Sequence, residues 1–124
     1  MTGVQTCALP IYTATTEIYT RPYTLALHDA LPISLAADRY DGFVALGCVV
    51  RGETTHYDYV CGESARGLMD LSIERKLAIG YGIVTVENME QAKARAFTDR
   101  GDKGGDAAHA CLAMVALVRR WRNA

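Results

Sequence analysis

The chain has 124 residues, half of them hydrophobic and 22% charged, with a formal net charge of −1. This length and composition allow one globular domain and exclude a disordered tail. The near-neutral charge excludes a basic surface for nucleic acid or an anionic membrane, and no apolar run reaches the ~18 residues of a membrane span. The cysteines form no CxxC pair and have no ligand-spaced histidines, so we expect no metal site, no disulfide framework and the buried thiols of a cytoplasmic protein. They are Cys7, Cys48, Cys61 and Cys111.

The first 34 residues differ from the rest of the chain. They contain all three prolines and repeat the tetrapeptide Ala-Leu-Pro-Ile at residues 8–11 and 30–33. The stretch has no helical or strand period and lacks the basic start of a signal peptide. It resembles the translation of two sequencing-library adapter arms, whose shared string GCTCTTCCGATC encodes Ala-Leu-Pro-Ile. We therefore interpret residues 1–34 as a non-native, poorly packed segment and residues 35–124 as the domain; the alternative is a natural Thr-rich leader.

The domain begins with an alternation of strand and helix patterns. Residues 42–50 (GFVALGCVV) form a short apolar, β-branched run, typical of a strand buried on both faces. Residues 57–75 place apolar side chains at the spacing of an amphipathic helix. After a turn at Lys76 and Leu77, a second apolar run predicts a strand over residues 78–85.

Two further helices complete the pattern. Asn88 followed by Gln91 has the spacing of a capping box and predicts a helix over residues 89–97. A charged, Gly-rich loop then precedes a last helix over residues 106–121, with arginines at its C-terminal end. The order strand, helix, strand, helix predicts an α/β fold, with parallel strands joined by right-handed crossovers and covered on both faces.

Ligands of such sheets bind beyond the carboxyl ends of the strands, which here means loops 51–56 and 85–88. The first loop, RGETTH, is the more informative. Thr54 or Thr55 can cap the following helix, whose N-terminal N–H groups attract an anion such as phosphate. His56 lies at the same end and can transfer protons near neutral pH. The alternative is a helix cap beside a surface histidine.

Other candidates are less specific. Arg95 lies on a short helix, where it is either part of a solvated face or a phosphate clamp. Lys103 precedes two glycines that can cradle an anion, but no Walker pattern surrounds it. Tyr81 lies between Gly80 and Gly82 in the second strand, which indicates either a core position or the close approach of a flat ligand.

Resemblance to a known family is carried by three blocks: ALGCVVRGETTHYDYV (45–60), GIVTVENMEQA (82–92) and DKGGDAA (102–108), with Arg95 and Ala96 between the last two. Together they resemble the 6,7-dimethyl-8-ribityllumazine synthase family over the whole predicted domain. The resemblance implies a three-layer α/β/α, flavodoxin-like fold. It also implies a cytoplasmic transferase of riboflavin biosynthesis, without metal or organic cofactor, that forms homopentamers or larger assemblies.

The implied reaction condenses 5-amino-6-(D-ribitylamino)uracil with 3,4-dihydroxy-2-butanone 4-phosphate. By position, His56 matches the proton-transfer histidine of the family. The residues matching pyrimidine contacts are Cys48, Val49, Val50 and Tyr81, the last being an aromatic position that stacks from a neighbouring subunit. The residues matching phosphate contacts are Glu53, Thr54 and Arg95, with Lys103 and Asp106 as further polar positions.

The resemblance also implies parts that we do not find before residue 35. Family members begin with further strands, an aromatic residue that stacks on the pyrimidine and a Gly-Ala-x-Glu-type loop that holds the ribityl chain. Without them the sheet lacks its N-terminal strands and the site lacks one wall, so we expect the chain as written to be inactive or weakly active. The alternatives are a non-catalytic shell subunit or truncated paralogue, and a generic flavodoxin-like phosphate-binding module.

Overall fold

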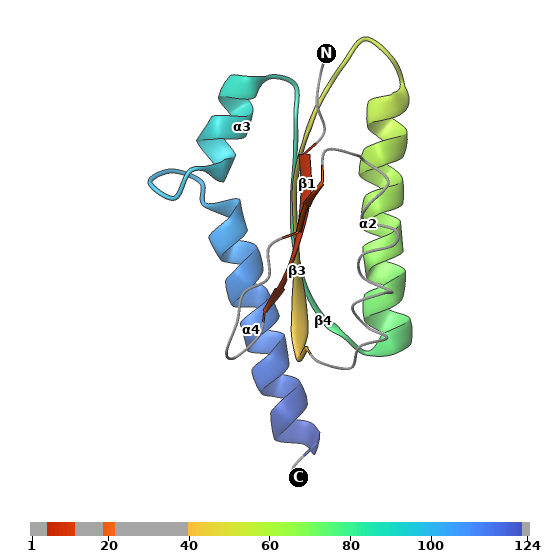
Figure 1. Cartoon of the computed structure of the whole chain (residues 1–124), viewed down its shortest axis with the longest axis vertical. Coiled ribbons are helices and arrows are strands. Elements are labelled where there is room, and N and C mark those ends of the chain that lie inside the picture. The colour runs from red at the N-terminus through yellow and green to blue at the C-terminus, as the bar shows by residue number, and fades with distance from the viewer. Residues whose placement is uncertain (1–4, 12–18, 22–39, 123–124) are drawn as a thin grey trace.

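The computed structural model describes residues 5–11, 19–21 and 40–122 (Figure 1). The chain order of the elements is β1 (Gln5–Ile11), β2 (Tyr19–Arg21), β3 (Gly42–Val50), α2 (His56–Arg75), β4 (Ala78–Val86), α3 (Met89–Ala96) and α4 (Lys103–Arg122). Within this part of the chain, no helix is both long enough and apolar enough to cross a membrane.

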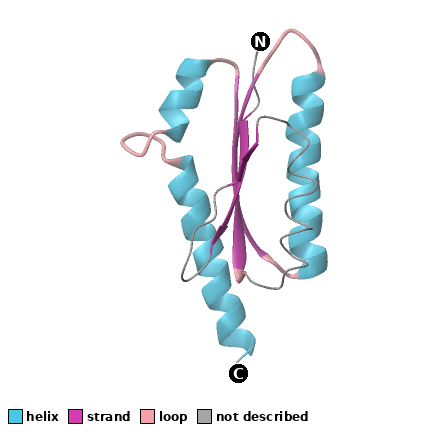
Figure 2. Ribbon diagram, viewed as in Figure 1, coloured by secondary structure: helices cyan, strands magenta, loops and turns pink. Residues whose placement is uncertain are grey.

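The elements form three layers, with the sheet between helices on both of its faces (Figure 2). α2 covers one face, and α3 and α4 cover the other (Figure 1). β3 and β4 are parallel and in register from Gly42 opposite Ala78 to Val50 opposite Val86. The predicted parallel pairing of these two strands, within a sheet that has helices on both faces, is therefore confirmed.

The core consists of two apolar layers because successive strand residues point to opposite faces. The cluster against α2 contains the buried residues Phe43, Ala45, Val49, Leu68 and Ile83. The clusters on the other face contain Val44, Ala78, Ala107 and Cys111 against α4, and Val84, Val86 and Ala92 against α3. Both faces of β3 are thus covered, which is why it reads as a continuous apolar run. On β4 the face toward α3 and α4 is buried, whereas Tyr81 and Thr85 on the α2 face are exposed.

The sheet also contains two strands that lie before the predicted domain, β1 and β2. The strand order is β2-β1-β3-β4, and β1 runs antiparallel both to β3 and to β2. β1 pairs along most of the β3 edge, from Gln5 opposite Cys48 to Ile11 opposite Gly42. Such pairing satisfies backbone N–H and C=O groups on the edge of β3 that β4 leaves open, and it places few demands on side-chain identity.

The segment 1–34 is thus described only at β1 and β2. The expectation that this segment packs poorly concerns mainly residues 1–4, 12–18 and 22–34, which lie outside the described residues. The side chain of Cys7 is also not described. β1 contacts the domain through backbone pairing, which any sequence can make. The proposed domain boundary at residue 35 therefore stays a prediction.

Candidate active site

β3 and β4 end side by side at one edge of the sheet. Val50 and Val86 are paired at this edge, and the N–H of Arg51 donates a further hydrogen bond to the carbonyl of Val86 (2.8 Å). Both following helices start here, α2 at His56 and α3 at Met89 (Figure 1). The two loops expected to carry the chemistry therefore leave the same edge of the sheet, as predicted.

Residues 51–56 are all exposed at this edge. His56 is the first residue of α2, and its backbone N–H donates to the Thr54 hydroxyl at 3.4 Å. Thr55 occupies the N-cap position but its side chain makes no capping bond. Of the two threonines considered as caps, Thr54 thus makes the contact, and it does so at the long limit of a hydrogen bond. The first turn of α2 presents N–H groups and the positive end of the helix dipole to an anion.

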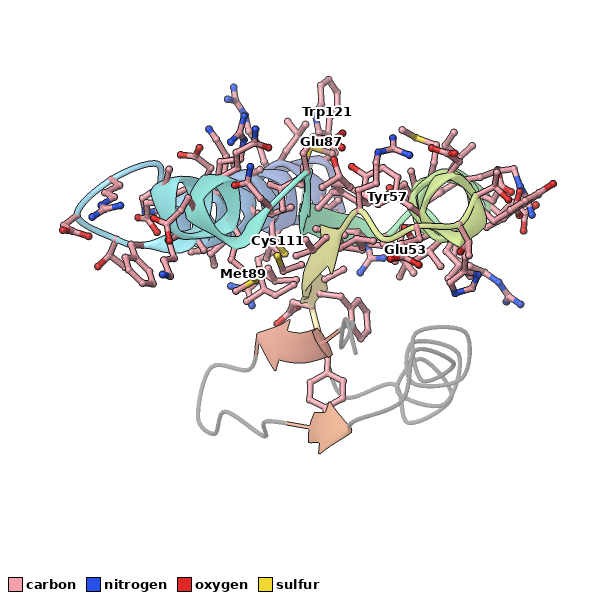
Figure 3. The ribbon with its side chains drawn as sticks, turned by 90° about the horizontal axis from the view of Figure 1, so that it is seen from above. Glu53, Tyr57, Glu87, Met89, Cys111 and Trp121 are labelled. Atoms are coloured by element: carbon pink, nitrogen blue, oxygen red, sulfur yellow. The ribbon has the colours of Figure 1, made fainter. Side chains whose placement is uncertain are left out.

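An arginine connects the two loops. The Arg51 guanidinium lies 2.9 Å from the Glu87 carboxylate and 3.2 Å from that of Asp58. Its central carbon lies 4.0 Å from the centroid of the Tyr57 ring. Figure 3 looks down on this edge and shows Glu53 and Tyr57 on the α2 side of the strand ends.

The strand end predicted to contact the pyrimidine is largely filled by the chain itself. Val49 is buried against α2, and Cys48 and Val50 are half-buried against the α3 face. These residues therefore have mainly backbone groups and partial side-chain surface to offer a ligand. Burial also raises the pKa of the Cys48 thiol, so it stays protonated at neutral pH and is a poor nucleophile.

Tyr81 is not a core residue. It lies on the α2 side of β4 with 43% of its surface exposed. The flanking glycines point to the opposite face: a Cβ on Gly80 would overlap the Ala107 carbonyl oxygen, and one on Gly82 would lie 3.0 Å from the Ala107 Cβ. The interpretation that these glycines leave room for a flat ligand is therefore wrong, because the space that their missing side chains leave is occupied by α4. The exposed ring of Tyr81 itself remains available for stacking.

The remaining predicted residues lie on the other layer of the fold. Arg95 is exposed on α3 and donates to the Gln91 carbonyl of its own helix (3.3 Å). Lys103 and Asp106 pair with each other at the start of α4 (2.7 Å), and this ammonium lowers the pKa of Asp106. α3 and α4 cover the face of the sheet opposite α2 (Figure 1). Within one chain, the structure thus separates these three residues from His56 by the sheet.

Three side chains of the site were missed by sequence reasoning, namely Tyr57, Asp58 and Glu87, and Arg51 was named only as part of its loop. A signal was present: Arg51 and Glu87 are the first residues after two parallel strands and carry opposite charges. Recognising the Arg51–Glu87 pair requires the register between β3 and β4, which the sequences of these two strands do not determine by themselves. Among the described residues, no group of three or more His, Cys, Asp or Glu side chains is arranged to hold a metal ion.

Comparison with known proteins identifies the family. The family described as "6,7-dimethyl-8-ribityllumazine synthase" matches residues 18–119, a range that begins upstream of the predicted boundary at residue 35. The chain is 53% identical over 118 residues to 6,7-dimethyl-8-ribityllumazine synthase 1 of Rhizobium meliloti, covering 91% of this chain and 77% of the relative. It is 52% identical over 111 residues to the synthase of Methylorubrum populi (86% of this chain, 66% of the relative) and 51% identical over 110 residues to that of Bartonella henselae (87% and 71%). The chain belongs to the 6,7-dimethyl-8-ribityllumazine synthase family.

Proposed function

We propose that the strand-end site carries out lumazine synthesis, the activity for which these relatives are named. The reaction joins the amino group of 5-amino-6-(D-ribitylamino)uracil to the carbonyl carbon of 3,4-dihydroxy-2-butanone 4-phosphate. Inorganic phosphate and two molecules of water leave, one water when the imine forms and one when the second ring closes. The observation that carries the proposal is the position of His56, on the first residue of α2, beside the edge where both parallel strands end.

The chain supplies two of the needs of this chemistry at one place. The N–H groups at the start of α2 can bind the phosphate group as it becomes a leaving group, because the helix dipole favours negative charge there. The imidazole of His56 can take a proton from the attacking amine and return one to the departing oxygen. We assign the contribution of Glu53 to its backbone N–H, since its carboxylate would repel a phosphate.

We further propose that the site is completed by a second copy of the chain in a cytoplasmic homo-oligomer, a pentamer or larger. Arg95 and Tyr81 match phosphate and pyrimidine contacts, yet the sheet separates Arg95 from His56 within one chain. Holding two substrates in register at a subunit interface also lowers the entropic part of the barrier. A domain of this size has a thin core, which assembly would supplement.

The test measures lumazine formation by the full chain, by its His56→Ala variant and by the synthase 1 of Rhizobium meliloti under the same conditions. We expect lumazine from the chain, more slowly than from the relative, and a further loss of roughly a hundredfold in His56→Ala. His109→Ala, on an exposed position of α4, is the matched control and should leave the rate unchanged.

Three results would contradict parts of this proposal. Equal rates for the chain and the relative would overturn the expectation of weak activity. A rate indifferent to His56→Ala would remove the assigned proton transfer. No product at all from the chain, with an active relative, would favour the non-catalytic assembly subunit instead.

A further inference from the structure

Arg51 is held from three sides at the edge where the strands end. Its Nε lies 2.9 Å from a Glu87 carboxylate oxygen, and its Nη2 lies 3.2 Å from Asp58 Oδ1. The plane of the guanidinium also covers the Tyr57 ring, with 4.0 Å from its carbon to the ring centroid. One side chain therefore contacts the end of β4 and the first turn of α2 together.

The charges of this cluster are unsuited to binding an anion directly. Arg51 contributes one positive charge, while Glu87 and Asp58 each contribute a negative one. The cluster therefore carries a net negative charge near neutral pH and does not attract phosphate. The guanidinium of arginine is a rigid planar group that fits carboxylates and stacks on aromatic rings. Arg51 makes both kinds of contact, with the two carboxylates and with the Tyr57 ring.

The loop that follows Arg51 has little else to fix it. All its residues are exposed, and its internal contact from the His56 N–H to Thr54 is long, at 3.4 Å. Arg51 stands at the start of the loop and Asp58 in the helix that follows it. Their ion pair therefore closes the loop on itself, while the contact with Glu87 attaches the closed loop to the neighbouring strand.

We propose that Arg51 is a positioning residue, which holds the loop of Thr54 and His56 in its working geometry by joining Glu87 to the first turn of α2. The inference rests on the proposed function, because the loop it positions is the one assigned to phosphate binding and proton transfer. Ion pairs as exposed as these contribute little to folding stability. Loss of Arg51 should therefore disturb the loop while leaving the fold intact.

The experiment compares Arg51→Ala and Arg51→Lys with Arg66→Ala in the full chain. Arg66 is the matched control, because it also bridges two carboxylates on α2, those of Glu63 and Asp70, away from the site. One readout is kcat and KM for lumazine formation. The other is hydrogen–deuterium exchange of the peptide spanning residues 51–58, which requires no turnover.

We expect Arg51→Ala to lower kcat by about tenfold to a hundredfold, the effect of a small misplacement of a catalytic group, with a smaller change in KM. Exchange across the loop should rise. Arg51→Lys should restore little of either, because a single ammonium cannot bridge both carboxylates and stack on Tyr57. Adding Glu87→Gln to Arg51→Ala should cause no further loss, since both changes break the same contact. Arg66→Ala should match the wild type in both readouts.

The two readouts separate failure of this inference from failure of the proposed function. Unchanged exchange in Arg51→Ala overturns the positioning role, whatever the activity. Faster exchange with unchanged kcat would show that the loop geometry does not matter for the reaction, and it would also overturn the positioning role. Faster exchange in a chain that makes no lumazine supports the positioning role and contradicts the proposed function. If the losses of kcat from Arg51→Ala and Glu87→Gln were additive in the double variant, Arg51 would act on the substrate directly, and the positioning role would be overturned.

Discussion

Gly80 marks the closest approach of α4 to the sheet. A Cβ built at this position would overlap the carbonyl group of Ala107 and lie 3.2 Å from the Cys111 Cβ. Backbone atoms cannot move aside as a flexible side chain can. The helix must therefore shift to admit even a methyl group, and with it the packing of a buried cluster.

Gly80→Ala should accordingly destabilise the protein by about 1–3 kcal/mol, the usual cost of overpacking a core. The same substitution at Gly62, on the exposed side of α2 with no atom within 4 Å, should instead stabilise it by about 0.5–1 kcal/mol through helix propensity. Urea denaturation of both variants measures the difference. Equal midpoints for the two alanines would contradict the packing role assigned to Gly80.

At the residue scale, sequence reasoning proposed the loop of the candidate site but did not predict its side-chain interactions. Thr54 and His56 were correctly placed at a helix start beside a strand end, because this position has a local sequence signature. The role of the glycines around Tyr81 was predicted wrongly. Glycines in a strand indicate that another group packs closely against it, but they do not show on which face of the sheet that group lies. Arg51 and Glu87 lie 36 positions apart, and only strand register brings them together.

At the element scale, α3 depends on a defined start. The Asn88 side chain accepts a hydrogen bond from the Gln91 N–H (3.0 Å), and the Gln91 side chain accepts one from the N–H of Glu87 (3.0 Å). The predicted capping box is thus present in a shifted form, with the return bond one residue before the cap. Because α3 has only eight residues, these bonds are a large share of what orders it.

Asn88→Ala should remove the cap and cost about 1 kcal/mol. The loss should be concentrated in α3, so hydrogen–deuterium exchange of residues 89–96 should rise more than that of α2. Asn88→Asp keeps the acceptor and adds a charge that the helix dipole favours, so its exchange should stay at the wild-type level. Equal exchange in the two variants would show that the side-chain cap does not order α3.

The elements of the domain were predicted closely where local signals exist. The strand over 42–50 has the predicted bounds, and the other elements differ by a residue or two at their ends, apart from one. That exception is α4, predicted from residue 106 but starting at Lys103. Asp102 accepts hydrogen bonds there from the N–H groups of Gly105 and Asp106, which draws the two glycines into the helix. The antiparallel partner of β3 was not predicted, because edge pairing is set by backbone groups common to all sequences.

At the scale of the whole molecule, α4 leaves an apolar stripe uncovered. Met114, Leu117 and Trp121 recur at helical spacing, and each is 45% or more exposed. On the helix it lies next to the buried positions Ala107 and Cys111 and continues toward the C-terminal end of α4. Exposed apolar surface of this kind is typical of an interface between chains. It agrees with the proposal that a second copy completes the site.

Leu117→Glu places a charge in the middle of this stripe and should weaken assembly, because a buried unpaired carboxylate is costly. Sedimentation velocity should show smaller species than the wild type at equal concentration, with the dissociation midpoint raised at least about tenfold and circular dichroism unchanged. Lumazine formation should fall in step with the loss of assembly, since the proposed site needs residues from two copies. Ala116→Glu introduces the same charge at an exposed position off the stripe and should alter neither property. An assembly that withstands Leu117→Glu would place the interface elsewhere, and a smaller species with full activity would show that one chain holds a complete site.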